Sequence, residues 1–241
     1  MEYTKEKTVG SFVAEDYRAA NVFQKYGIDF CCRGNISLQE VSDLNKLDAN
    51  KLIEELKEAV KAPDANEPDF RTWPLDELAD YIVKKHHAYI TKSIPLLNQY
   101  LDKICQVHGD RHPELLEIKK LFNTAAANLE AHLQKEERML FPYINKLADI
   151  KKNGLKEKVE HGVWTVQNPV RVMMMEHDAE GERFRIMSQL SNGYTTPGDG
   201  CRTYQVTFSM LKEFESDLHR HIHLENNILF PGAIALENEL F

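Results

Sequence analysis

The sequence predicts an all-α protein in which a small helical N-terminal domain precedes an up-down four-helix bundle. Three observations support this fold class. Apolar residues recur at spacings of three and four over four long segments, and no segment alternates as a strand would. In addition, the second half of the chain repeats the polar and apolar pattern of the first. Amphipathic helices with short connections bury such stripes against each other as a bundle.

Residues 1–62 are expected to form the small helical domain. A first helix covers residues 11–25 and stops near Gly27. Asp48 is a suitable N-cap for a second helix, whose apolar stripe consists of Leu52, Ile53, Leu56 and Val60. A domain of about 60 residues with so few large apolar groups would be marginally stable alone. We therefore expect it to pack against the bundle or against a partner, and a homodimer is one such arrangement.

A linker is expected between this domain and the bundle. It covers residues 63–74, which contain Pro63, Pro68 and Pro74 and show no helical period. Proline and the residue before it both disfavour helix. The remaining residues, 75–241, then form the bundle.

Six polar residues interrupt the apolar stripes of the four long helices. In chain order they are His86 on the first helix, His132 and Glu136 on the second, His177 on the third, and His221 and Glu225 on the fourth. Breaks near Pro113, over 151–162 and over 195–200 separate these helices. A buried imidazole or carboxylate without a partner costs roughly 2–7 kcal/mol. The cost is avoided if the groups bind one another, water or metal ions.

The positions of these residues repeat along the chain. The two single histidines are 91 positions apart, and the His-x-x-x-Glu cassette of the second helix recurs 89 positions later in the fourth. Both cassettes are followed at the same distance by Leu-Phe-Pro, at 140–142 and 229–231. Residues four apart on an α-helix lie on one face, about 5–6 Å apart at Cβ. Each cassette therefore presents an imidazole and a carboxylate to one point, and two αα-hairpins bring the two points together.

Six such residues in register predict a metal site rather than a set of hydrogen-bonded core side chains. Two carboxylates offset only part of the charge of two divalent ions, which favours oxo, hydroxo or carboxylate bridges. Nitrogen and oxygen ligands suit iron, zinc or manganese. Carboxylate-rich sites on facing helices of a bundle favour two iron ions among these.

Four further polar side chains lie beside these ligands in the sequence. His87 follows His86 directly, and the helical phase favours His86 as the ligand. Glu176 precedes His177 and either orients and tunes that ligand or lies on a solvated face. His219 and His223 point off the face of the fourth helix that carries the ligands, so surface or supporting roles are expected for them.

The motifs resemble a known family. The series of His, His-x-x-x-Glu, His and His-x-x-x-Glu with both Leu-Phe-Pro tails is similar to hemerythrin-like (HHE) domains, and the matching ligands are His86, His132, Glu136, His177, His221 and Glu225. Residues 26–35, Tyr-Gly-Ile-Asp-Phe-Cys-Cys-Arg-Gly-Asn, resemble the small domain that precedes the bundle in the iron–sulfur cluster repair di-iron proteins, the repair-of-iron-centres family. Residues 175–182 and 224–231 are also similar to that family, so the resemblance covers essentially the whole chain.

The resemblance implies a non-haem di-iron centre with bridging glutamates. It also implies that the protein restores iron–sulfur clusters damaged by nitric oxide or peroxide, by supplying iron to the damaged proteins. Two other functions stay open. The iron pair would reduce nitric oxide or peroxide directly in an enzyme, or bind oxygen, nitric oxide or iron in a non-catalytic sensor. Whether the protein is an enzyme is therefore undecided by the sequence.

Two adjacent cysteines, Cys31 and Cys32, lie in a loop of the small domain. The neighbouring Arg33 would lower a thiol pKa and raise its reactivity, whereas the alternative is a pair of inert, half-buried thiols. The resemblance favours a function for them, with three roles open: docking to a damaged cluster, passing iron as thiolates, or redox sensing through a vicinal disulfide. Cys105 and Cys201 have no such surroundings and are expected to be structural.

Composition limits the remaining function classes. The net charge is −8 and no basic cluster occurs, which argues against a nucleic-acid partner. The sequence contains no run of 18 apolar residues, so no membrane span is expected. The first residues lack the basic and then apolar pattern of a secretory signal. Four cysteines, two of them adjacent, do not form a disulfide framework, so a reducing cytoplasm is expected.

Overall fold

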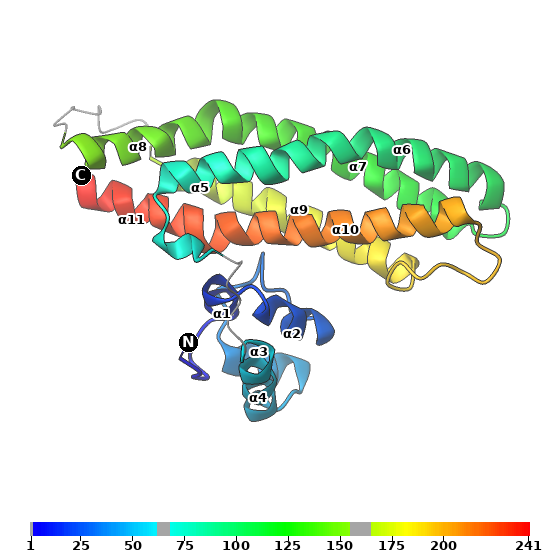
Figure 1. Cartoon of the computed structure of the whole chain (residues 1–241), viewed down its shortest axis with the longest axis horizontal. Coiled ribbons are helices and arrows are strands. Elements are labelled where there is room, and N and C mark those ends of the chain that lie inside the picture. Colours follow the sequence, from blue (N-terminus) through cyan, green and yellow to red (C-terminus); the bar gives the residue numbers. More distant parts are fainter. Residues whose placement is uncertain (1, 62–67, 155–164) are drawn as a thin grey trace.

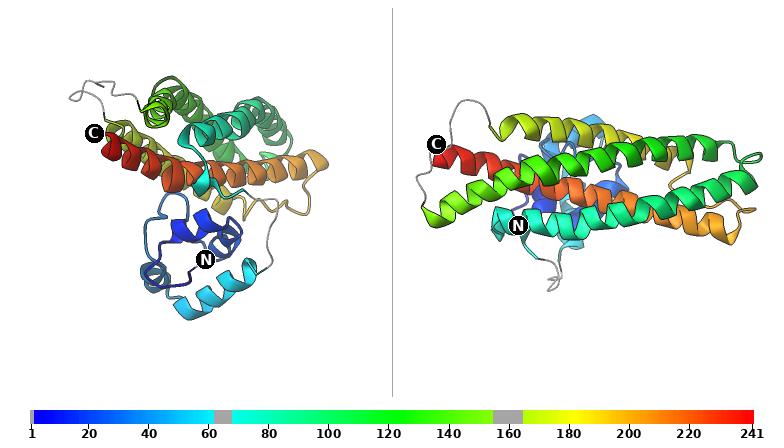
Figure 2. Two further views of the ribbon diagram at one scale, coloured as in Figure 1. Left: turned by 60° about the vertical axis from the view of Figure 1, so that its left-hand side comes forward. Right: turned by 90° about the horizontal axis from the view of Figure 1, so that it is seen from above.

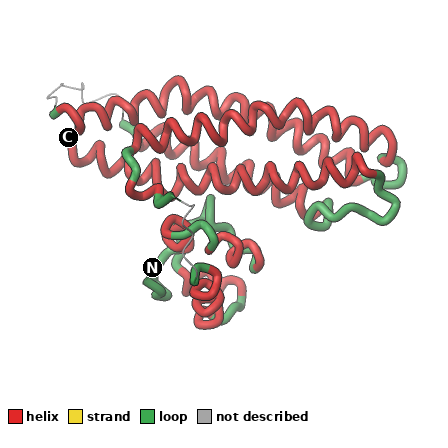
Figure 3. The backbone as a smooth tube through the Cα atoms, in the orientation of Figure 1, coloured by secondary structure: helices red, strands yellow, loops and turns green. Residues whose placement is uncertain are grey.

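The computed structural model describes residues 2–61, 68–154 and 165–241 (Figure 1). Over these residues the regular structure is helical, apart from one isolated bridge between Thr8 and Ser37 (Figure 3). The all-α prediction is therefore confirmed. The first part of the predicted linker, residues 63–67, and most of the predicted break at 151–162 lie outside the described residues.

Four long helical rods form the bundle. Their segments are α5 (Leu75–Ile82), η2 (Val83–His87) and α6 (Ala88–His108) in the first; α7 (Glu114–Lys135), η3 (Glu136–Leu140) and α8 (Phe141–Asn153) in the second; α9 (Gln167–Leu190) in the third; and α10 (Arg202–Leu224), η4 (Glu225–Leu229) and α11 (Phe230–Leu240) in the fourth. Helix α6 packs against α7 and α10, and α7 packs against α9. The rods run up and down beside each other, as Figure 2 shows from above.

The apolar stripes meet in the middle of the bundle. Phe122 of α7, Phe184 of α9 and Phe214 of α10 are fully buried. The ring of Phe214 lies 5.6 Å from that of Phe122 and 5.5 Å from that of Phe184, measured between centroids. Burying a side chain of this size stabilises the fold by about 1.5–3 kcal/mol. These contacts hold three of the four rods together on one side of the polar residues.

Three of the rods contain one π-helical turn each, η2, η3 and η4. Two of these turns begin at the glutamate of a His-x-x-x-Glu cassette and are followed by the Leu-Phe-Pro proline. A proline lacks an N–H and its ring crowds the carbonyl four residues back. For Pro142 that carbonyl belongs to Arg138, inside η3, and Pro231 has the same relation to η4. The wider turn accommodates the proline, so the rods continue into α8 and α11.

The N-terminal unit, residues 2–61, contains four short helices. They are α1 (Val9–Glu15), α2 (Ala19–Lys25), α3 (Leu38–Asn45) and α4 (Ala49–Ala59), and a 3-10 turn, η1 (Phe70–Thr72), precedes the bundle. The single helix predicted over 11–25 is wrong, because the backbone is extended at Asp16, whose carboxylate instead binds Arg18. Asp48 caps α4 as predicted, by accepting from the N–H groups of Asn50 and Lys51.

This unit packs on one side of the bundle (Figures 1 and 2). A continuous hydrophobic core joins the two, and α1 contacts α10 and η4. The approach is closest at Gly10 of α1, where an added Cβ would lie 2.2 Å from Oδ1 of Asn227. Asn227 in turn donates to the carbonyl of Phe30 at 3.3 Å. No helix of the described chain is long and apolar enough to cross a membrane.

Gly10→Ala is expected to disturb this contact. The added methyl group would meet the Asn227 side chain and the carbonyl of Gly34, 3.0 Å away. We expect unfolding in urea to show a loss of about 1–3 kcal/mol of stability, as overpacking usually costs. Gly198→Ala is the control, since a Cβ there meets nothing within 4 Å. Equal stability of the two variants would contradict a tight contact at Gly10.

Candidate metal centre

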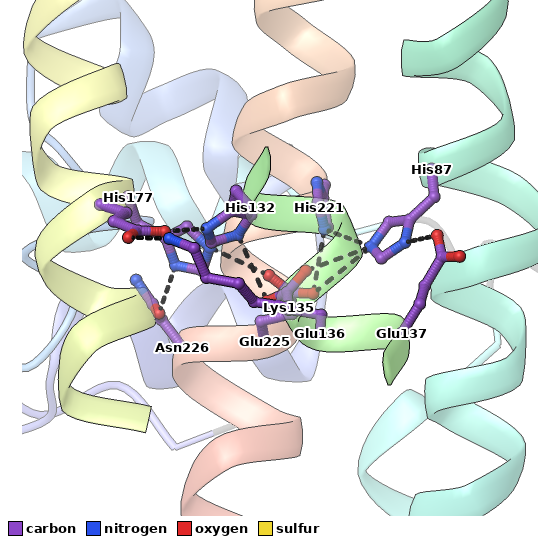
Figure 4. Close-up of polar contacts among 10 residues, drawn as sticks. His87, His132, Lys135, Glu136, Glu137, His177, His221, Glu225 and Asn226 are labelled. Atoms are coloured by element: carbon purple, nitrogen blue, oxygen red, sulfur yellow. Dashed lines mark hydrogen bonds and ion pairs between the residues drawn. The ribbon is translucent and has the colours of Figure 1, made fainter. Parts of the chain in front are cut away.

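Six buried side chains from all four rods converge in the middle of the bundle (Figure 4). Their metal-ligating atoms form two groups, and all atoms of a group lie within 4.8 Å of one another. The first ligand group is His87, Glu136, His221 and Glu225, and the second ligand group is His132, Glu136, His177 and Glu225. None of these residues is more than 3% exposed.

In the first ligand group the histidines present their Nε2 atoms to the interior. Nε2 of His87 lies 3.2 Å from Nε2 of His221 and 3.4 Å from Oε2 of Glu136. Nε2 of His221 lies 2.9 Å from Oε1 of Glu225. His221 thus belongs to the His-x-x-x-Glu cassette of the fourth rod, whereas His87 comes from the first rod.

The second ligand group has the same plan. Nε2 of His132 lies 3.0 Å from Nε2 of His177 and 3.3 Å from Oε1 of Glu136. Nε2 of His177 lies 3.2 Å from Oε2 of Glu225. Each glutamate therefore turns one oxygen towards each group, because Oε2 of Glu136 and Oε1 of Glu225 face the first.

These donors fit cations better than they fit one another. Two imidazole Nε2 atoms at 3.0–3.2 Å form a hydrogen bond only if one of them carries a proton. Both oxygens of Glu136 and Oε2 of Glu225 are buried without a hydrogen-bond partner. Such buried, unsatisfied groups cost about 1–3 kcal/mol each, and more when charged. Cations with a preference for nitrogen and oxygen ligands would satisfy all of them at once.

The structure places His87, and not the predicted His86, in the first ligand group. The cause is the π-helical turn η2, in which the N–H of Ala88 bonds to the carbonyl of Val83, five residues back. One extra residue in the turn moves the inward position from the fourth to the fifth residue after Ile82. His86 instead bonds through Nδ1 to Asp217 at 3.0 Å. No sequence signal marks this turn beyond the presence of two adjacent histidines.

The outward Nδ1 atoms of the inward histidines are held by polar partners. His87 donates to Glu137 at 2.8 Å, and His177 donates to Oδ1 of Asn226 at 2.9 Å. With Nδ1 as the donor, each neutral ring directs the lone pair of Nε2 inwards. The sequence did not identify either partner.

Glu176 holds a different histidine from the one beside it in the sequence. Its Oε2 accepts from Nδ1 of His132 at 2.8 Å, and its other oxygen pairs with Lys135. It therefore connects α9 to α7, and its two bonds go to His132 and Lys135. Its side chain is 32% exposed, so it lies partly in solvent while it orients the ring of His132.

The charges of the site attract cations. Burial opposes protonation of His87, but Glu136 and Glu225 raise its pKa to about 10. His132 is likewise buried, and the same two glutamates with Glu176 raise its pKa to about 9. Burial would raise the pKa of Glu225, yet the surrounding histidines hold it well below its usual value. The two carboxylates thus stay ionised and require positive charge beside them, from protons or from metal ions.

The two adjacent cysteines lie next to this centre, in the loop between α2 and α3. Cys32 donates from Sγ to the carbonyl of His177 at 3.5 Å. Asn226, which holds the ring of His177, also donates to the carbonyl of Cys31 at 3.1 Å. The pKa of Cys31 is raised, by its contact with Cys32, by burial and by Asp29, so the expected activation by Arg33 is wrong for this thiol.

Other sulfur and imidazole groups lie outside the two ligand groups. Cys105 donates to the carbonyl of Leu115 inside the bundle, while Cys201 is exposed at the start of α10. His223 is only 2% exposed, and burial lowers its pKa to about 3. Its ring lies 6.0 Å from that of Phe30, so it supports the N-terminal unit and is not a surface residue.

Comparisons with known proteins agree with this architecture. Residues 5–60 match the family model ScdA_N, described as a domain of unknown function, and residues 78–233 match the hemerythrin HHE cation binding domain. The bundle thus belongs to the hemerythrin HHE cation binding domains, and its two ligand groups could hold metal ions.

Relatives are similar over nearly their whole length. The iron-sulfur cluster repair protein ScdA of Staphylococcus haemolyticus is 31% identical over 229 residues, which cover 94% of this chain and 97% of that protein. The iron-sulfur cluster repair protein YtfE of Musicola paradisiaca is 32% identical over 237 residues, covering 98% and 100%. YtfE of Escherichia coli O157:H7 is 31% identical over 233 residues, covering 97% and 99%. With both domains in the same order, this chain belongs to the ScdA and YtfE family of iron-sulfur cluster repair proteins.

Proposed function

We propose that the bundle holds two iron ions, one in each ligand group, and that the protein supplies iron to iron–sulfur clusters damaged by oxidative or nitrosative stress. One observation carries the two-ion proposal. Glu136 and Glu225 each direct one carboxylate oxygen to each group, which is the arrangement of a bridging ligand. The repair role is supported by the names of relatives that cover nearly all of this chain.

The chain's own residues would bind, orient and shelter these ions. His87 and His221 would hold the first ion and His132 and His177 the second, while Glu136 and Glu225 belong to both ligand groups. Glu137, Glu176 and Asn226 keep the rings turned inwards. When bound, iron supplies redox-active ions that are at the same time the cargo that a damaged cluster needs.

The thiols of Cys31 and Cys32 are the proposed contact with the damaged protein or with the departing iron. Two connections support this role. Cys32 lies against the backbone of His177, and Asn226 joins the carbonyl of Cys31 to the His177 ring. A damaged protein that engages this loop would therefore contact residues that are hydrogen-bonded to His177, a proposed metal ligand.

The assignment of His87 is tested by alanine substitution. We expect His87→Ala to lose at least half of the iron bound by the wild type, because it removes a donor from the first ligand group. His86→Ala is the matched control, since this ring binds Asp217 outside both groups. Iron content after anaerobic loading is the measurement, with circular dichroism as the check of folding. Loss of iron from His86→Ala alone would refute the assignment.

Bridging is tested by comparing a glutamate with a histidine. Glu225→Ala removes a donor from both ligand groups, whereas His177→Ala removes one from the second group only. We therefore expect Glu225→Ala to retain less iron than His177→Ala, and the residual iron of His177→Ala to be mononuclear in Mössbauer spectra. Equal, complete retention of paired iron in Glu225→Ala would contradict a bridge at this residue.

The repair role is tested on a hydratase whose cluster has been damaged by nitric oxide. Iron-loaded protein is expected to restore its activity, and the double variant Cys31→Ser with Cys32→Ser is expected to do so at least tenfold more slowly at equal iron content. Cys105→Ser, which changes a thiol inside the bundle, should behave as the wild type. Undiminished repair by the double variant would remove the role of the thiols. Steady turnover of nitric oxide without any client would instead support a reductase.

A further inference from the structure

A third group of metal-ligating atoms lies outside the bundle centre, in the loop between α2 and α3. It consists of Asp29, Cys31 and Cys32, whose ligating atoms all lie within 4.8 Å of one another. Sγ of Cys31 lies 3.7 Å from Sγ of Cys32 and 3.4 Å from Oδ1 of Asp29. Two sulfurs and one carboxylate oxygen are therefore close neighbours.

The spacing of these atoms matches the edges of a coordination tetrahedron. Two thiolates about 2.3 Å from a tetrahedral ion lie about 3.8 Å apart, and a thiolate and a carboxylate oxygen about 3.5 Å apart. The two distances at Cys31 agree with these values to within about 0.1 Å. No backbone rearrangement is needed to bring this pair of edges to a ligating geometry.

The loop backbone fixes the carboxylate in this position. Oδ1 of Asp29 accepts the N–H of Cys31 at 3.1 Å and the N–H of Cys32 at 2.9 Å. These bonds tie the oxygen to the two residues that carry the sulfurs. The carboxylate is therefore held beside both sulfurs before any ion arrives, and the two remaining lone-pair sites of the carboxylate are on its other oxygen.

An ion also has a route to the group. Asp29 and Cys31 line a cleft of about 460 Å³ between the N-terminal unit and the bundle, together with Gly181, Arg185 and His219. Cys31 itself is only 3% exposed, so the sulfur is sheltered while the cleft remains open. Water from the cleft can take the position that the three protein ligands leave free, as in open tetrahedral sites.

We propose that Asp29, Cys31 and Cys32 form a mononuclear site for a divalent transition ion of the Fe²⁺ and Zn²⁺ class, separate from the pair of ions in the bundle. Two sulfur ligands with one carboxylate favour such ions over Mg²⁺ or Ca²⁺. On binding, the two thiols release their protons to solvent and the ion keeps its charge, so no oxidant or reductant is needed. The suggestion that this site receives iron from the bundle rests on the proposed function. The suggestion that it binds a metal ion does not.

The test uses the full chain with iron already in the bundle and with reduced thiols, under anaerobic conditions. Cobalt(II) is added as the probe. We expect one cobalt ion per chain to bind with thiolate-to-cobalt charge-transfer absorption and the intense visible bands of a tetrahedral ion, without release of iron. Alkylation mapped by mass spectrometry should be slowed at Cys32 and unchanged at Cys201.

Variants decide whether these three residues form the site. Asp29→Asn keeps an oxygen that accepts from the two N–H groups, so the loop is preserved while the charged ligand is lost. We expect it to weaken cobalt binding at least tenfold, and Cys32→Ser to remove most of the charge-transfer absorption. Cys201→Ser should bind as the wild type.

Three results would overturn the proposal. They are the absence of charge-transfer bands, bands that are unchanged in Asp29→Asn and Cys32→Ser, and cobalt uptake that equals iron release. The repair assay is decided separately from this one. If Asp29→Asn lost cobalt binding but repaired clusters at the wild-type rate, the metal site would stand and its role in receiving iron would be refuted.

Discussion

The burial of two carboxylates in the middle of a helical bundle is the constraint on which the rest of this structure depends. Glu136 and Glu225 are completely buried, and neither could remain ionised there without positive charge beside it. Four imidazoles, one from each rod, meet this requirement and offer the same donors to metal ions. Because the four rings must reach the same two carboxylates, the rods have little freedom to slide along one another.

The backbone around the site is adapted to the same constraint. Each cassette glutamate begins a π-helical turn, and the proline two residues beyond the turn needs the extra space that it creates. A third π-helical turn, η2, carries His87 to the centre from the opposite rod. Such turns are rare in proteins, and those that occur are often at functional sites. They re-aim a side chain without ending the helix. Here they set the level at which the four rods meet.

One of these turns also connects the metal centre to the N-terminal unit. In η4, Glu225 belongs to both ligand groups, Asn226 joins His177 to the cysteine loop, and Asn227 bonds to the same loop. Gly10 is needed where α1 approaches this turn most closely. A change in either ligand group or in the cysteine loop would therefore act on shared hydrogen bonds. This arrangement gives a physical reason for the two domains to occur in one chain.

The sequence by itself determined the helical class, the internal repeat and most of the centre. Residues four apart on a helix share a face, so His132 with Glu136 and His221 with Glu225 could be paired from spacing alone. Only the tertiary structure decided between His86 and His87, because a π-helical turn depends on packing and leaves no periodic signal. The partners Glu137 and Asn226 and the burial of Cys31 were also beyond sequence reasoning. They arise from contacts between residues that lie far apart in the chain or from the way two units pack, and neither is encoded in local spacing.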